Sequence, residues 1–273
     1  MIDKTICELF AGVGGFRLGF EKSSKEWKTV WANQWEPGRK NQHAFDCYCS
    51  HFGQSRNHVN EDIASIDKLI IPDHNLLVGG FPCQDYSVAR TGAKGIKGVK
   101  GVLWWEIRDV IEKKAPKFVL LENVDRLLKS PSKQRGRDFG VMLTCLNDLG
   151  YNVEWRIINA AEYGFAQRRR RVFIFAYKNY TSYARYITKI TPKSVINNAG
   201  FFAKTFPIEL INTISSMKLE YNDIVDVSDN FKFEFENTGF MSDGIIYTSK
   251  TIPILEEPIV LREILEKKVD ELT

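Results

Sequence analysis

Short apolar runs rich in β-branched residues alternate with mixed polar and apolar stretches along the first 180 residues. The runs are 6–10, 29–32, 76–78, 118–121, 153–158 and 172–177, and each has the length and composition of a buried strand. The longer stretches between them suit helices. This alternation predicts a doubly wound, mostly parallel α/β sheet covered by helices on both faces. Ligands of such sheets bind outside the carboxyl ends of the strands.

The charge of the chain divides it into two parts. Residues 201–273 hold seven Lys and Arg against 14 Asp and Glu, which leaves 31 basic and 20 acidic residues in 1–200. A basic body favours a polyanion such as nucleic acid, although most surface charge taken singly is only solvated. With 44% hydrophobic residues the chain is long enough for one large domain or one and a half. We expect a domain over 1–180 and an acidic extension over 181–273.

Location is indicated by three further features. No stretch approaches the roughly 20 apolar residues of a membrane span, and residues 1–4 lead directly into the first expected strand rather than into a signal peptide. The five cysteines are an odd number without a paired framework, as in a reducing compartment. We therefore expect a cytoplasmic protein. Cys47 and Cys49 form a weak metal motif, so a buried structural role is expected for both and no metal is predicted.

Four segments of differing chemistry lie at the ends of the expected strands. They are a glycine turn (residues 8–15, ELFAGVGG), a Pro-Cys segment (81–84, FPCQ), a Glu-Asn-Val segment (122–124) and a Gln-Arg segment (167–171, QRRRR). Each has an ordinary explanation when taken alone: many glycine turns bind nothing, most strand-end cysteines are inert, Glu-Asn often caps a loop, and an arginine run is often a solvated face. Their order is what makes them informative.

In this order, the four segments resemble the cytosine-C5 DNA methyltransferase family over about residues 5–176. The resemblance implies a class I, Rossmann-like fold, S-adenosylmethionine as cofactor and double-stranded DNA as substrate. It also implies a restriction-modification setting in a prokaryotic, nucleoid-associated location. The glycine spacing is not the Gly-x-Gly-x-x-Gly of a typical NAD site, which disfavours a dehydrogenase.

The resemblance implies a cofactor-binding set. Its members are Phe10, Gly12, Gly14, Gln34, Trp35, Asp62, Ile63, Pro82 and Leu103. Phe10 would pack on the adenine, and Gly12 and Gly14 would approach the amino-acid portion. Gln34 stands where the family commonly has an acidic residue on the ribose, so a neutral hydrogen bond replaces a charge-assisted one unless Glu36 substitutes. Asp62 suits an adenine contact and a helix cap equally well.

The chemistry of cytosine explains the catalytic set that the resemblance implies. C5 is a poor nucleophile until a thiolate adds to C6, and Cys83 is the matching thiol. Addition moves charge toward N3 and O2 of the ring. The resemblance assigns the N3 contact to Glu122, as a proton or hydrogen-bond donor, and the O2 contact to Arg171 supported by Arg169.

A base stacked in a duplex is out of reach, so this chemistry requires the cytosine to be flipped into the pocket. Residues 87–101 combine basic residues with glycines, as expected of a closing loop that contacts phosphates. The expected DNA contacts are Gln84, Ser87, Arg90, Lys94, Lys97, Lys100 and Arg126.

The later part of the chain departs from the family pattern. No Gly-Asn-Ser-Val occurs in it, and about 95 residues follow Tyr177, too few for a target-recognition domain and the closing motifs. One interpretation is a split enzyme that needs a second polypeptide, docked through the acidic extension. Others are a silent remnant that binds S-adenosylmethionine or nucleic acid, and an RNA cytosine methyltransferase. Intact Cys83, Glu122 and Arg171 favour the first interpretation.

Overall fold

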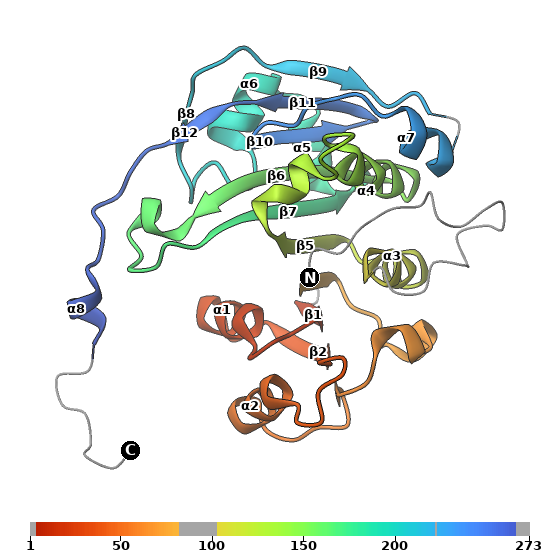
Figure 1. The fold of residues 1–273 in the computed structure, drawn as a ribbon, viewed down its shortest axis with the longest axis vertical. Coiled ribbons are helices and arrows are strands. Elements are labelled where there is room, and N and C mark those ends of the chain that lie inside the picture. Colours follow the sequence, from red (N-terminus) through yellow and green to blue (C-terminus); the bar gives the residue numbers. More distant parts are fainter. Residues whose placement is uncertain (1–3, 82–102, 222, 266–273) are drawn as a thin grey trace.

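A ten-stranded sheet runs through the protein from β3 at one edge to β9 at the other (Figure 1). The computed structural model describes residues 4–81, 103–221 and 223–265. The strands are β1 (Thr5–Leu9), β2 (Lys28–Asn33), β3 (His58–Val59), β4 (Leu76–Gly80), β5 (Phe118–Asn123), β6 (Tyr151–Asn159), β7 (Arg170–Lys178), β9 (Ser215–Lys218), β10 (Thr238–Ser242) and β11 (Ile245–Ser249). A separate pair consists of β8 (Ile208–Leu210) and β12 (Thr251–Pro253).

The helices and single turns connect these strands. The α-helices are α1 (Gly15–Ser23), α2 (His43–Phe52), α3 (Leu103–Lys114), α4 (Arg137–Asp148), α5 (Ser182–Ile187), α6 (Pro192–Ser194), α7 (Ile224–Asn230) and α8 (Leu261–Ile264). Short 3₁₀ turns are η1 (Ile63–Ser65), η2 (Lys68–Ile70), η5 (Asp125–Lys129) and η6 (Ala160–Tyr163), and η7 (Val195–Ala199) is a π-helical turn. None of the described helices is both long and apolar enough to cross a membrane.

The sheet has a parallel half and an antiparallel half. In the order β3-β2-β1-β4-β5-β7-β6-β10-β11-β9, the neighbours from β3 to β5 are parallel. From β5 onward every neighbouring pair is antiparallel. All six runs expected from the sequence are strands, and the Rossmann-like, doubly wound α/β class is confirmed. Strands β9 to β11, from the expected acidic extension, belong to this same sheet.

Alternating side chains of the strands supply two apolar layers, as the pleat of a strand requires. Val172, Ile174 and Ala176 of β7 face the core beneath α3, α4 and α7. Phe175 and Tyr177 face the opposite side, where α5 and η7 cover the antiparallel half. Over the parallel half, α1 covers that same side through Phe16 and Phe20, which pack on Ile6, Leu76 and Val78. Both faces of the sheet are therefore covered by helices.

After β12 the chain leaves the body and runs to α8 along the outside (Figure 1). Three backbone amides tie the first part of this tail to the body: Ile254 N donates to Pro207 O, Glu256 N to Glu162 O and Ile259 N to Gly164 O. Beyond these bonds several large apolar side chains are exposed, namely Val260, Leu261, Ile264 and Leu265.

Candidate active site

A pocket of about 1000 Å³ opens at the carboxyl ends of the parallel strands, where the sequence predicts the ligand. Its walls come from the segments after β1, β2 and β4, from η1 and from the first turn of α3. Seven of the nine expected cofactor residues line it: Phe10, Gly12, Gln34, Trp35, Asp62, Ile63 and Leu103. Pro82, the eighth, lies outside the described residues.

Gly14, the ninth, serves the turn itself and is not among the residues that line the pocket. Its φ of +90° is left-handed, and a Cβ on it would stand 2.2 Å from the ring of Phe52. The amide of Gly14 closes the turn on Ala11 O at 2.8 Å. Gly12, with φ +57°, is different, because a Cβ there would meet nothing within 4 Å. Glycine is thus needed at 12 for conformation alone and at 14 also for close packing against α2.

Gln34 holds the glycine turn in place. Its Oε1 accepts a hydrogen bond from Gly12 N at 2.7 Å, across the ends of β1 and β2. Glu36, the other candidate for a ribose contact, accepts from Ala44 N through Oε2 at 3.2 Å and also lines the pocket. Gln34 therefore has a structural bond that the sequence did not indicate, and its Nε2 is the group left to face a ligand.

Asp62 performs the helix-cap role and also lines the pocket. Its Oδ1 accepts from Ala64 N at 3.0 Å and so caps η1, while the residue forms part of the pocket wall. The two interpretations offered by the sequence are compatible, because a carboxylate has a second oxygen for another donor.

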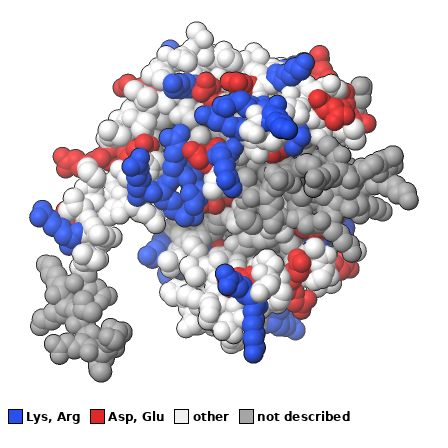
Figure 2. All heavy atoms as spheres, in the orientation of Figure 1, with Lys and Arg blue, Asp and Glu red and all other residues white. Residues whose placement is uncertain are grey.

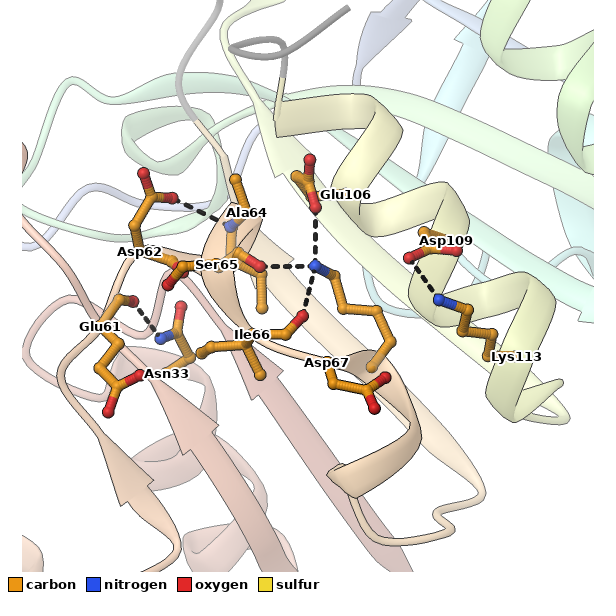
Figure 3. A network of polar contacts seen from close by, with 12 residues as sticks. Asn33, Glu61, Asp62, Ala64, Ser65, Ile66, Asp67, Glu106, Asp109 and Lys113 are labelled. Carbon is orange, nitrogen blue, oxygen red and sulfur yellow. Dashed lines mark hydrogen bonds and ion pairs between the residues drawn. The ribbon is translucent and has the colours of Figure 1, made fainter. Parts of the chain in front are cut away.

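One pocket residue and its support were missed by sequence reasoning. Glu106, in the first turn of α3, lines the pocket, and Lys68, only 3% exposed, forms an ion pair with it. The two charged groups are 2.8 Å apart (Figure 3). No motif marks Lys68, since a lone lysine usually lies on the surface.

The pocket fits S-adenosylmethionine in size and in chemistry. Aromatic and aliphatic side chains from Phe10, Trp35, Ile63 and Leu103 suit a flat purine. Among the described residues that line the pocket, three are acidic, namely Glu36, Asp62 and Glu106, and one, Arg39, is basic. This net negative lining suits a cationic sulfonium, and the carboxylates are acceptors for hydroxyl and amino groups.

A second group of residues lies beside the pocket at the end of β5. Oε1 of Glu122 accepts from Arg169 Nη2 at 3.0 Å and forms an ion pair with Arg171 Nε at 2.9 Å. Gly80, in the pocket wall, is next to it, because a Cβ there would stand 3.3 Å from Glu122 Oε2. The Gln-Arg segment reaches this edge by starting the antiparallel strand β7, whose first residues lie where β4 and β5 end. The structure thus brings Glu122, Arg169 and Arg171 together.

Asn123 connects this group to the Pro-Cys segment. Its buried side chain donates from Nδ2 to Phe81 O at 2.9 Å and accepts from Val124 N at 2.8 Å. The backbone immediately before Pro82 is therefore fixed by β5. Cys83 lies outside the described residues, as do Gln84, Ser87, Arg90, Lys94, Lys97 and Lys100, so these remain predictions.

Basic side chains gather on the face that carries this edge. Figure 2 shows Lys and Arg over η5 and over the start of β7, with acidic side chains among them. Arg126, the remaining expected DNA contact, is exposed in η5. Its neighbour Asp125 pairs with Arg170 at 2.8 Å, which ties η5 to β7.

A buried carboxyl group supports the glycine turn from below. Glu8 in β1 is fully buried, accepts from Tyr48 Oη at 3.2 Å and lies 3.4 Å from the amide of Arg17 in α1. Burial raises the pKa of Glu8 to about 7, against the opposing effect of these two hydrogen bonds. Tyr48 in turn packs beneath Gly14.

The cysteines of α2 correct one expectation. Cys49 is buried as expected, but Cys47 is exposed, because two positions on a helix separated by two residues point in different directions. Cys7 and Cys145 are buried free thiols. In the described part of the chain no group of His, Cys, Asp or Glu is placed to hold a metal ion.

Comparison with known proteins decides the family. A family model described as C-5 cytosine-specific DNA methylase matches residues 4–251, which is most of the chain and includes both the pocket and the Glu122 group. The chain belongs to this family.

Two relatives in this methylase family are type II methyltransferases. M.Sau3AI of Staphylococcus aureus is 54% identical over 97% of this chain and 66% of its own length. M.NgoBI of Neisseria gonorrhoeae is 38% identical over 64% of this chain and 51% of its own length. The chain therefore spans about two thirds of the first relative and about half of the second.

Solved structures agree on the methylase fold. A mutant DNMT2 of Spodoptera frugiperda matches with a TM-score of 0.52 at 17% identity, over 65% of this chain and 51% of that one. At this identity the likeness concerns the fold alone.

Proposed function

We propose that this chain transfers a methyl group from S-adenosylmethionine to C5 of a cytosine in double-stranded DNA, in a restriction-modification setting. The observation that carries the proposal is the position of Glu122. It forms ion pairs with Arg169 and Arg171 and lies at the rim of a pocket that suits S-adenosylmethionine. Family membership and the type II methyltransferase relatives support the same reaction.

The proposed roles follow from what each side chain offers. Phe10, Trp35, Ile63 and Leu103 hold the adenosine portion, with Asp62 and Glu36 as acceptors. When bound, the cofactor supplies an electrophilic methyl group. Because Gly12 and Gly14 have no Cβ, the cofactor can approach the backbone of the turn closely.

On the base, we propose that the thiolate of Cys83 bonds to C6, which raises electron density at C5 so that C5 takes the methyl group. Transfer of the C5 proton to water, with cleavage of the Cys83–C6 bond, then restores the aromatic ring and the thiolate. Glu122 contacts N3 and the guanidinium groups of Arg169 and Arg171 face O2, where charge develops. This chemistry requires a flipped cytosine, with phosphate contacts from Arg126, Gln84, Ser87, Arg90, Lys94, Lys97 and Lys100.

The proposal does not depend on a second polypeptide. M.Sau3AI carries its matching region and a further third of its length in one chain, so the comparisons give no support to a separate subunit. Target choice is a property of the whole protein, and we limit the proposal to cofactor binding and methyl transfer.

The test is transfer of a labelled methyl group from S-adenosylmethionine to duplex DNA and, separately, to structured RNA, with Cys83→Ser as the control. Label in DNA that carries 5-methylcytosine, lost in Cys83→Ser, supports the proposal. Label in RNA alone assigns the RNA alternative. If the chain binds the cofactor but transfers no label, even to DNA supplied at high concentration, the result supports the silent remnant.

A further inference from the structure

Lys68 is a buried lysine at the junction of two walls of the pocket. It begins η2, and its Nζ donates to Ile63 O at 2.5 Å and to Ile66 O at 2.9 Å. The third partner is Glu106 Oε2 of α3, at 2.8 Å. The ammonium group therefore has two hydrogen bonds and one ion pair, and Figure 3 shows Glu106 of α3 and the carbonyl of Ile66 directed toward the same nitrogen.

Lys68 contacts two walls of the pocket. The two carbonyls belong to the turn that begins with Ile63, a pocket residue preceded by the pocket residue Asp62. The carboxylate belongs to the helix turn that also presents Leu103. One ammonium group thus links two walls that lie about 40 residues apart in sequence.

Glu106 has an oxygen left for a ligand. Its side chain is 18% exposed and lines the pocket, and among the described residues Lys68 bonds only Oε2. The second oxygen of this carboxylate can accept from a hydroxyl, amine or ammonium group.

We propose that Lys68 is a positioning residue for the cofactor pocket: it fastens the Ile63–Ile66 turn to α3 and presents the carboxylate of Glu106 as an acceptor for a hydrogen-bond donor of the cofactor. The inference rests on the proposed function, because it takes the cofactor to be S-adenosylmethionine. It adds one ligand-contacting group, Glu106, and one residue that acts through it.

The experiment measures binding of S-adenosylmethionine and of S-adenosylhomocysteine by calorimetry to the parent chain, Lys68→Met, Glu106→Gln and the double variant. Lys113→Met is the matched control, because Lys113 pairs with Asp109 at 3.0 Å on the exposed side of the same helix. We expect Kd to rise on the order of tenfold in Lys68→Met for both ligands. Glu106→Gln raises it less, the double variant resembles Lys68→Met, and Lys113→Met matches the parent.

The outcomes separate the proposal from simpler explanations. A fall in Tm with unchanged Kd, measured well below Tm, means that Lys68 is only structural and overturns the proposal. A loss confined to S-adenosylmethionine means that Glu106 acts on the sulfonium charge, and overturns the acceptor role. Additive effects of the two substitutions overturn the coupling between the residues.

If the parent chain binds neither ligand, the proposed function fails, and amide hydrogen exchange then decides the positioning role. Faster exchange in Lys68→Met that is confined to residues 63–70 and the first turn of α3 supports it. Unchanged exchange at both places, or a uniform increase over the whole chain, overturns it.

Discussion

The parallel and antiparallel halves of the sheet use buried charge in different ways. In the parallel half Gln34, Asp62 and Glu122 lie near strand ends and face the pocket or its rim, while Glu8 is buried within β1. In the antiparallel half Glu154 and Arg156 of β6 lie within the sheet, beneath η7 and the chain that follows it. The first arrangement leaves acceptors for a ligand. The second directs its charged groups to partners within the protein and fastens one layer to another.

The partners of the second pair explain its role. Arg156 donates to Ile196 O and to Phe206 O, both at 2.5 Å, while Glu154 accepts from Tyr183 Oη and from Phe201 N, both at 2.7 Å. These four bonds secure the covering segment that carries α5 and η7. The comparison teaches that burial of a charged residue does not by itself mark a ligand site in this fold, because Glu154 and Arg156 bind segments of the protein itself.

The largest expected effect is on the antiparallel half. Arg156→Ala removes the donor to the carbonyls of Ile196 and Phe206 and the positive charge near the buried carboxyl group of Glu154. We expect the free energy of unfolding to fall by about 3–5 kcal/mol. Arg185→Ala is the control, because Arg185 also donates to a backbone carbonyl but is exposed; it should change stability by less than about 0.5 kcal/mol. Urea denaturation measures both. Equal effects would mean that burial is not what makes Arg156 important.

A pH series compares one buried glutamate from each half. Burial raises the pKa of Glu154 to about 7, as it does for Glu8, from an ordinary value of 4.5. The folded state therefore holds protons that the unfolded state has released. The stabilising contribution is complete below about pH 4.5 and is lost as pH rises to about 7, with a slope of about 1.4 kcal/mol per pH unit for each group.

Glu154→Gln and Glu8→Gln should each flatten this decline in denaturation experiments. Only Glu8→Gln should also change the pH dependence of S-adenosylhomocysteine binding, because Glu8 contacts the elements that hold the glycine turn. A change in binding by Glu154→Gln as large as that by Glu8→Gln would contradict the division between the halves.

Gly14→Ala tests the packing of the glycine turn. A Cβ at φ +90° and 2.2 Å from Phe52 is expected to cost about 2 kcal/mol of stability and to weaken cofactor binding. Gly15→Ala, the adjacent control, has open space at Cβ and an ordinary φ, so it should be neutral or slightly stabilising. Thermal unfolding with and without S-adenosylhomocysteine measures both effects, and a Gly14→Ala protein as stable as the parent would refute the steric argument.

Asn123→Ala compares a site residue with a matched residue of the other half. It removes the bond to Phe81 O, and we expect stability to fall by about 1.5 kcal/mol together with the rate of methyl transfer, because the Pro-Cys segment loses its anchor. Asn237→Ala is the counterpart: Asn237 bridges the amide and carbonyl of Thr251 and should cost similar stability. A loss of kcat in Asn237→Ala as large as that in Asn123→Ala would show that kcat follows stability alone.

The smallest expected effect is at Gln34. Gln34→Glu keeps the acceptor for Gly12 N and makes that bond charge-assisted, so we expect S-adenosylmethionine to bind more tightly by up to about fivefold. Gln34→Ala should weaken binding, since the turn loses its support. Calorimetry measures both variants, and weaker binding by Gln34→Glu would mean that the existing negative lining already limits affinity.

How far the sequence predicted this molecule differs between the same two halves. The parallel half carries ordered motifs at the ends of apolar runs. Its strands and the position of its pocket followed from them, and seven of the nine residues expected to bind the cofactor line that pocket. The direction of β7 did not follow, because an apolar run does not reveal which way its neighbour runs. The roles of Lys68, Glu154 and Arg156 were also missed, since each depends on hydrogen-bond partners that only the folded chain brings close.

The antiparallel direction of β7 has a consequence for insertions and deletions. Arg169 and Arg171 alternate with Arg170, so the outer two reach Glu122 while the middle one reaches Asp125. The register of β7 against β5 and β6 fixes this choice. Removing or adding one residue in the 164–168 connection, if β7 shifted to absorb it, would turn every side chain to the opposite face. In this connection the number of residues is therefore under stricter constraint than their identity.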